Sequence, residues 1–164
     1  MRTLLAGSAI AALVAALAAC GSSGMSAAAA ADRKAANILA IDQIERSWHQ
    51  AASKKDLDLM MSLWAPNATF TFGGQTASGR AAIRKVLKAA APFQPQNHWV
   101  SDTPAYKIRT TVNGSKGTLY FECHYIDVKT QKVMSVVAAD QNVQKINGKW
   151  LITNSSGASP TLSP

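Results

Sequence analysis

The C-terminal half of the chain is a series of β-prone runs separated by turn signals, and this pattern constrains the fold more than any other feature. Four runs are predicted to be strands, at residues 98–112, 117–128, 133–146 and 149–154. Asn113-Gly114 and Asn147-Gly148 are typical of two-residue hairpin turns, and residues 129–131 predict a third turn. The pattern therefore predicts a four-stranded antiparallel meander.

Helices are predicted ahead of this meander at residues 35–53, 57–64 and 80–91, with a short strand at 69–72. In the first helix the apolar residues Ile41, Ile44 and Trp48 recur at three- and four-residue spacing, which is the period of an amphipathic helix. Asp56 is a suitable N-cap for the second helix. Helices followed by a run of strands predict an α+β domain whose helices pack on one face of the sheet.

The first 20 residues have the features of an export signal. Arg2 precedes an uncharged apolar run over residues 4–19, which is shorter than the roughly 20 residues of a membrane span. The run ends in Leu17-Ala18-Ala19-Cys20, which resembles the lipobox of bacterial lipoprotein precursors. This resemblance implies cleavage before Cys20, lipidation of that cysteine, and anchoring in the bacterial cell envelope, facing the periplasm or the exterior. The alternative is an ordinary secretory signal that is cleaved within residues 27–31.

The chain is thus predicted to have four parts: a signal peptide at 1–19, a flexible tether at 20–33, one folded domain at 34–155 and a disordered tail at 156–164. The formal charge is +8 and falls by one when Arg2 is removed. The basic residues are scattered except on the third helix, so no nucleic-acid partner is predicted. The membrane is the predicted partner, through lipidated Cys20.

The order of these elements resembles the NTF2-like superfamily and, within it, the SnoaL-like group. The segments that carry this resemblance are residues 44–48, 55–58, 63–68, 79–83, 98–114 and 146–152. It implies a cone, with three N-terminal helices packed on a curved antiparallel sheet around a pocket. Members include isomerases, dehydratases, polyketide cyclases and epoxide hydrolases, as well as proteins that only bind. Many members are homodimers through the outer sheet face.

Two departures from the family's enzymes weaken an enzymatic interpretation. Residues 65–72 carry no acid, although enzymatic members often place an aspartate there. Gln141, beside Asp140, stands nine positions before Trp150, where many relatives have an acidic residue. Because a side-chain amide does not exchange a proton near neutral pH, these departures favour binding over catalysis.

The strand at 117–128 has an apolar row and an ionisable row. Leu119, Phe121, Cys123 and Tyr125 alternate with Tyr120, Glu122, His124 and Ile126. The ionisable row either lies on the outer sheet face or lines the pocket, where Glu122 and His124 would share a proton. Cys123, on the apolar row, is expected to be a buried inert thiol.

Further candidate site residues come from the resemblance and from neighbouring positions. His98 opens the first strand of the meander, where the resemblance places a pocket-facing histidine, and Asp102 would orient it. The predicted catalytic residues are His98, Asp102 and Glu122. The predicted pocket residues are Trp48, Trp64, Trp99, Tyr120, His124 and Asp140. His49 and Glu45 are expected to form an exposed helical pair.

No metal site or cofactor is predicted. The histidines at 49, 98 and 124 lack short ligand spacing, two cysteines exclude a four-cysteine metal site, and no nucleotide-binding or zinc-protease motif occurs. The leading hypothesis is an envelope lipoprotein whose pocket binds a small apolar or amphipathic ligand or a protein partner. The alternative is a cofactor-free acid–base enzyme of the ketosteroid isomerase, dehydratase or polyketide cyclase type that uses His98. A structural dimer without a ligand is the third hypothesis.

Overall fold

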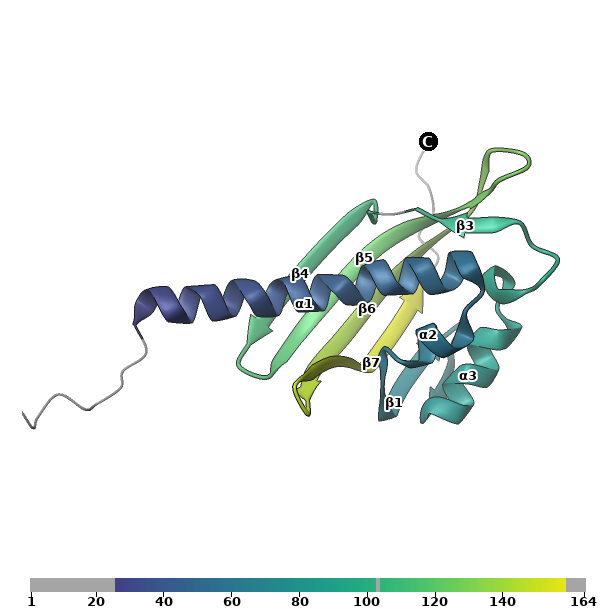
Figure 1. Ribbon diagram of the computed structural model, residues 1–164. Coiled ribbons are helices and arrows are strands. Elements are labelled where there is room, and N and C mark those ends of the chain that lie inside the picture. The colour runs from purple at the N-terminus through teal and green to yellow at the C-terminus, as the bar shows by residue number, and fades with distance from the viewer. Residues whose placement is uncertain (1–25, 103, 159–164) are drawn as a thin grey trace, which may run out of the picture.

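The computed structural model describes residues 26–102 and 104–158, so the predicted signal peptide and Cys20 lie outside the described residues. Its helices are α1 (Ala27–Lys54), α2 (Leu57–Met61) and α3 (Arg80–Ala89), followed by the 3-10 turn η1 (Ala91–Phe93). Its strands are β1 (Trp64–Phe72), β2 (Gln75–Ser78), β3 (Trp99–Ser101), β4 (Lys107–Asn113), β5 (Lys116–Asp127), β6 (Lys132–Ile146) and β7 (Lys149–Ala158). Helix α1 runs across one face of the curved sheet, and α2 and α3 gather at one end of it (Figure 1).

The sheet has the order β2-β1-β7-β6-β5-β3, and β4 also pairs with β5. Most strand pairs are antiparallel, as predicted, but β1 and β7 are parallel, with Phe70 opposite Ser155. The sheet is therefore mixed, which corrects the expected antiparallel sheet. Hairpin signals report only on neighbouring strands, whereas this pairing joins the two ends of the domain.

Helix α1 begins earlier than predicted. It starts at Ala27, where the Ser26 hydroxyl accepts a hydrogen bond from the Ala29 N–H at 3.2 Å. Alanine has the highest intrinsic helix propensity, so the alanine-rich residues expected to form a tether are helical from position 27. Residues 27–36 are exposed, and this part of α1 extends beyond the sheet (Figure 1).

Three other boundaries differ from the predictions. The Asp56 carboxylate caps α2 as predicted, accepting from the Leu59 N–H at 2.8 Å, but the helix ends at Met61 and β1 begins at Trp64. The predicted strand 98–112 is divided, because β3 and β4 pair with opposite ends of β5. Strand β7 continues to Ala158 because its last residues pair with β6.

The core lies between α1 and the inner face of the sheet. The apolar row of β5 points into it: Leu119, Phe121 and Cys123 have no exposed surface, and Tyr125 is nearly buried. Of the two orientations that the sequence allowed for this strand, the structure has the one that puts the ionisable row outside. Burial of the large apolar side chains decides the orientation, because turning the strand over would expose all of them.

Gly117 has no room for a side chain between β4 and the core, and we expect its replacement by alanine to be costly. A Cβ atom there would lie 2.5 Å from the Thr111 carbonyl oxygen and 3.0 Å from Cδ1 of Ile41. We expect Gly117→Ala to lower the free energy of unfolding by roughly 1–3 kcal/mol, measured by urea denaturation. At Gly157 the added Cβ would meet the half-exposed ring of Phe72, which can turn away, so Gly157→Ala is the control and should cost less. Equal costs would contradict this packing.

Candidate functional site

An apolar pocket of about 90 Å³ lies between the C-terminal end of α1, α3, η1 and the inner face of the sheet. Its lining contains no charged residue. The lining residues are Trp48, Phe70, Phe72, Val86, Leu87, Ala90, Pro92, Phe93, Tyr125, Val137, Ala139 and Gly157. Phe72 and Val86 are 43% and 39% exposed, so they form the mouth, whereas Phe70, Leu87 and Ala139 are buried. The site can accept a small apolar group and offers it no ion pair.

Aromatic rings give the pocket its wall. Trp48 packs against Trp64 and Phe121, with ring centroids 5.9 and 5.8 Å apart, and Phe70 stacks on Phe72 at 6.1 Å. Trp48 projects from α1, whereas Phe70 and Phe72 belong to β1. These contacts hold the wall together, because stacked and edge-to-face ring pairs restrict one another's orientation.

Two buried polar residues neighbour the lining residues along β6 and β7. Gln141 on β6 and Ser155 on β7 lie opposite each other in the sheet. Gln141 is two residues after the lining residue Ala139, and Ser155 is two residues before the lining residue Gly157, so both are on the same sheet face as the lining. Both side chains are buried, and neither the Gln141 amide nor the Ser155 hydroxyl has a hydrogen-bond partner among the described residues. Such groups cost free energy while they remain unpaired.

A second buried feature is an ionisable pair on α1. Glu45 and His49 are 2% and 0% exposed, with Oε1 of Glu45 3.0 Å from Nδ1 of His49, so the expectation of an exposed pair was wrong. The physical reason is the helix period, since residues 45 and 49 fall on the same stripe as Ile41, Trp48 and Ala52. The Glu45 carboxylate also accepts a hydrogen bond from the Ala105 N–H at 2.9 Å.

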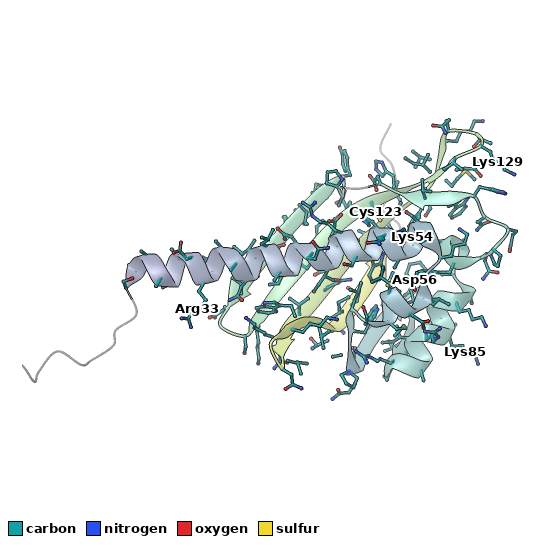
Figure 2. All side chains as sticks on the ribbon, in the orientation of Figure 1. Arg33, Lys54, Asp56, Lys85, Cys123 and Lys129 are labelled. Atoms are coloured by element: carbon teal, nitrogen blue, oxygen red, sulfur yellow. The ribbon has the colours of Figure 1, made fainter. Side chains whose placement is uncertain are left out.

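Asp102 and Cys123 lie beside this pair. A ring nitrogen of His49, a carboxylate oxygen of Asp102 and Sγ of Cys123 are all within 4.8 Å of one another. Asp102 is tied to β5, since Oδ1 accepts from the His124 N–H at 2.7 Å. Figure 2 labels Cys123 on β5, where α1 passes in front of the sheet. Residues from α1, from the end of β3 and from β5 thus meet under the helix.

The Cys123 thiol is expected to be unreactive in the folded protein. Burial, with a smaller contribution from the Asp102 and Glu45 carboxylates, raises its pKa to about 12, although contacts with Ser101 and Tyr125 lower it. At pH 8 the group is therefore protonated and shielded, so we expect iodoacetamide to modify it only after unfolding in urea, as measured by mass spectrometry. Cys20 in the same unlipidated chain is the internal control. Rapid modification of native Cys123 would contradict this environment.

The ionisable row of β5 lies on the outer face of the sheet and forms contacts there. Tyr120 donates a hydrogen bond to Glu122, Lys107 pairs with Glu122 at 3.1 Å, and the Arg109 guanidinium lies 4.2 Å from the Tyr120 ring centroid. Hydrogen bonds from Tyr120 and Lys107 lower the pKa of Glu122, and the bond to Glu122 raises that of Tyr120. His124 stacks on Tyr106, with ring centroids 5.1 Å apart.

Of the predicted pocket residues, only Trp48 lines the pocket. Trp64 is fully buried behind Trp48, and Trp99 is half-buried against Tyr125, with ring centroids 6.3 Å apart. Tyr120, His124 and Asp140 lie outside because each alternates along β5 or β6 with buried residues that face α1.

The predicted catalytic residues are not gathered at the pocket. His98 is exposed, and its backbone carbonyl accepts a hydrogen bond from Val128 at the far end of β5. Asp102 contacts His124 and the buried His49 cluster, and Glu122 is on the outer face. The sequence reasoning missed Phe93, Pro92 and Ala90, which follow α3, although the Pro-Phe pair after an amphipathic helix was an available signal.

The architecture and the pocket define the class of protein. A long helix across a curved mixed sheet, with an apolar pocket at one end, is the NTF2-like, cystatin-like fold. The sequence profile of the SnoaL-like domain matches residues 33–156. The chain therefore belongs to the SnoaL-like domain family. A search of curated protein sequences finds no significant match.

Solved structures show the same fold at low sequence identity. An NTF2-like protein from Novosphingobium aromaticivorans is 17% identical with a TM-score of 0.70, over 85% of this chain and 94% of that chain. An NTF2-like protein from Pseudomonas putida is 13% identical with a TM-score of 0.67, over 77% of this chain and 88% of that chain. The hexachlorocyclohexane dehydrochlorinase LinA-type3 from Novosphingobium barchaimii is 16% identical with a TM-score of 0.65, over 82% of this chain and 93% of that chain. No helix among residues 26–102 and 104–158 is long and apolar enough to span a membrane.

Proposed function

We propose that this protein binds a small apolar or amphipathic molecule in the pocket between α1, α3 and the sheet. The observation that carries the proposal is the lining, which is apolar from the exposed mouth at Phe72 and Val86 to the buried floor at Ala139. Ligand pockets are concave and mostly apolar, and their affinity comes largely from the apolar surface removed from water.

The size of the pocket limits the ligand. A volume of about 90 Å³ is well below the roughly 300–1,000 Å³ of pockets that enclose drug-sized molecules. The proposed ligand is therefore a single ring or the end of a longer apolar chain that leaves through the mouth. One neighbour of the same fold, the dehydrochlorinase, is named for hexachlorocyclohexane, a small apolar ring.

Gln141 and Ser155 support the amphipathic form of the ligand. They are the next residues of β6 and β7 on the pocket side of the sheet after the lining residues Ala139 and Gly157, and their unpaired polar atoms offer a hydroxyl or carbonyl group both donors and acceptors. An apolar ligand leaves these groups unpaired. We therefore expect phenol to bind more tightly than toluene once the different cost of removing each from water is subtracted.

The proposed location is the bacterial cell envelope, through a lipid attached to Cys20. The N-terminal end of α1 extends away from the end of the molecule where α3 lies (Figure 1). The pocket, which α3 lines, is at that far end. An anchor preceding α1 would therefore hold the pocket away from the membrane. Labelling with a radioactive fatty acid should be abolished by Cys20→Ala, and labelling that persists would contradict the anchor.

Binding is tested by the change in melting temperature of the full chain on addition of toluene or phenol. We expect both compounds to raise it, since a ligand that binds only the folded state stabilises that state. Val86→Asp, which places a charge at the mouth, should weaken the effect. Val128→Asp is the matched control, because Val128 is also partly exposed, at 47% against 39% for Val86, but does not line the pocket. No stabilisation of the wild type, or equal loss in both variants, would contradict the proposed site.

Acid–base catalysis is the second candidate function. The observation that favours it is the buried Glu45–His49 pair, whose imidazole packs on Phe121, which in turn packs on the pocket-lining Trp48. A histidine held by a carboxylate is a common proton acceptor in enzymes. For this candidate function we expect His49→Gln to abolish turnover while leaving toluene binding intact, and His98→Gln to affect neither.

A further inference from the structure

We propose that His49, Asp102 and Cys123 form a binding site for a divalent transition metal ion, with Zn²⁺ as the ion expected. The three residues are brought together by α1, the segment after β3 and the middle of β5. Their ligand atoms, a ring nitrogen, a carboxylate oxygen and Sγ, lie within 4.8 Å of one another. This site is separate from the pocket, because none of the three residues lines it.

The donor set matches the preference of zinc. Zn²⁺ binds imidazole nitrogen, carboxylate oxygen and thiolate sulfur at about 2.0–2.3 Å, and in tetrahedral sites its ligands are therefore about 3.5 Å apart. The observed atoms would have to approach by little more than about 1 Å, which side-chain rotation can supply. Three protein ligands leave the fourth position to water.

Charge also favours a cation here. Asp102 is half-buried and Glu45 is buried, yet the only basic side chains in ion-pair contact with them among the described residues are His124 and His49. An ionised Asp102 and a thiolate at Cys123 carry two negative charges, and a divalent ion makes the set neutral. A complex in which the charges of ion and ligands cancel is the form that a buried site tolerates at least cost.

Glu45 fits the role of a positioning residue for the metal-binding histidine. Its carboxylate is 3.0 Å from Nδ1 of His49 and is itself fixed by the Ala105 N–H. Metal-binding histidines usually donate their second ring N–H to a carboxylate or carbonyl, which fixes the orientation of the ring. The proposal therefore assigns Nε2 of His49 to the metal.

Binding displaces a proton from the thiol. Cysteine binds metal ions as the thiolate, so the thiol gives up its proton when the ion binds. The bond that forms is between the ion and sulfur, the bond that breaks is S–H, and the proton leaves to solvent. No oxidation is involved. The sequence could not indicate this site, because its ligands are far apart in the chain and only one of them is a histidine.

The test is titration of the metal-free, full-length protein with Co²⁺, whose bond to a thiolate gives an intense near-ultraviolet charge-transfer absorption. We expect this absorption to saturate at one equivalent. The absorption should disappear in Cys123→Ser and persist in Cys20→Ala. The two variants are a matched pair, since each keeps one cysteine and only Cys20→Ala keeps the proposed ligand. Glu45→Gln should weaken the affinity for Co²⁺ by about 10–100-fold, as expected for a residue that orients a ligand. His98→Gln, at an exposed histidine, is the control and should leave it unchanged.

Circular dichroism of each variant shows whether it is folded, and Asp102→Asn provides a second ligand variant with nearly unchanged shape. The proposal is overturned if the folded wild type shows no thiolate absorption with 1 mM Co²⁺, or if the absorption survives in folded Cys123→Ser. It is also overturned if Asp102→Asn binds Co²⁺ as tightly as the wild type and the control His98→Gln do. These outcomes are independent of toluene and phenol binding.

Discussion

Replacing Glu45 by alanine is expected to lower the free energy of unfolding by about 2–5 kcal/mol, because it removes a buried carboxylate with two buried polar contacts, and losing the partner of a buried polar group costs roughly 1–3 kcal/mol. The Glu45 carboxylate is buried and accepts from the Ala105 N–H, and it contacts Nδ1 of His49. Alanine would leave the Ala105 N–H without its acceptor and open a cavity under α1. Urea denaturation measures the effect.

Two controls separate this mechanism from a simple change of charge. Glu45→Gln keeps an acceptor of nearly the same shape, so we expect it to cost less than Glu45→Ala. Glu122→Ala removes a carboxylate from the outer face of the sheet, where its pair with Lys107 is worth about 1 kcal/mol or less. If Glu45→Ala were no more destabilising than Glu122→Ala, the described burial of the pair would be wrong.

Replacing Trp64 by alanine is expected to lower the free energy of unfolding by about 3–5 kcal/mol, as for other fully buried tryptophans. Trp64 has no exposed surface and packs between Trp48 and Phe70, with ring centroids 5.9 and 5.5 Å away. The alanine variant loses both contacts and leaves a cavity behind the pocket wall. Because Trp48 and Phe70 line the pocket, we also expect toluene binding to weaken.

The matched control is Trp99→Ala, because Trp99 is half-buried and packs on one ring, that of Tyr125. It should cost clearly less in the same urea titration. Trp64→Phe should restore most of the stability, since the smaller ring keeps the edge-to-face contact with Phe70. If both tryptophan-to-alanine variants were equally stable, Trp64 would not be the centre of this cluster.

Local signals in the sequence predicted much of the fold. Spacing of apolar residues located α1 and α3, Asp56 located the start of α2, and the Asn-Gly pairs located the turns that precede β5 and β7. The parallel pairing of β1 with β7 carried no such signal, because it depends on how the whole sheet closes. The split between β3 and β4 likewise follows from their different partners on β5.

The site was less predictable than the fold, and for a physical reason. The resemblance and the residue types directed attention to ionisable residues, such as His98, Glu122 and His124, which lie at or near the surface. The pocket is instead built from apolar side chains that sequence patterns assign to the core. His49 and Glu45 were expected at the surface because polar residues usually are, yet the period of α1 places them inside.

The position of a bound small molecule tests the central claim most directly. In a crystal of the protein exposed to toluene, we predict electron density for the ring between Phe70, Leu87 and Ala139, with Phe72 and Val86 at its open side. A pocket that stays empty at saturating toluene, or toluene bound only on the outer face of the sheet, would contradict the proposed ligand site.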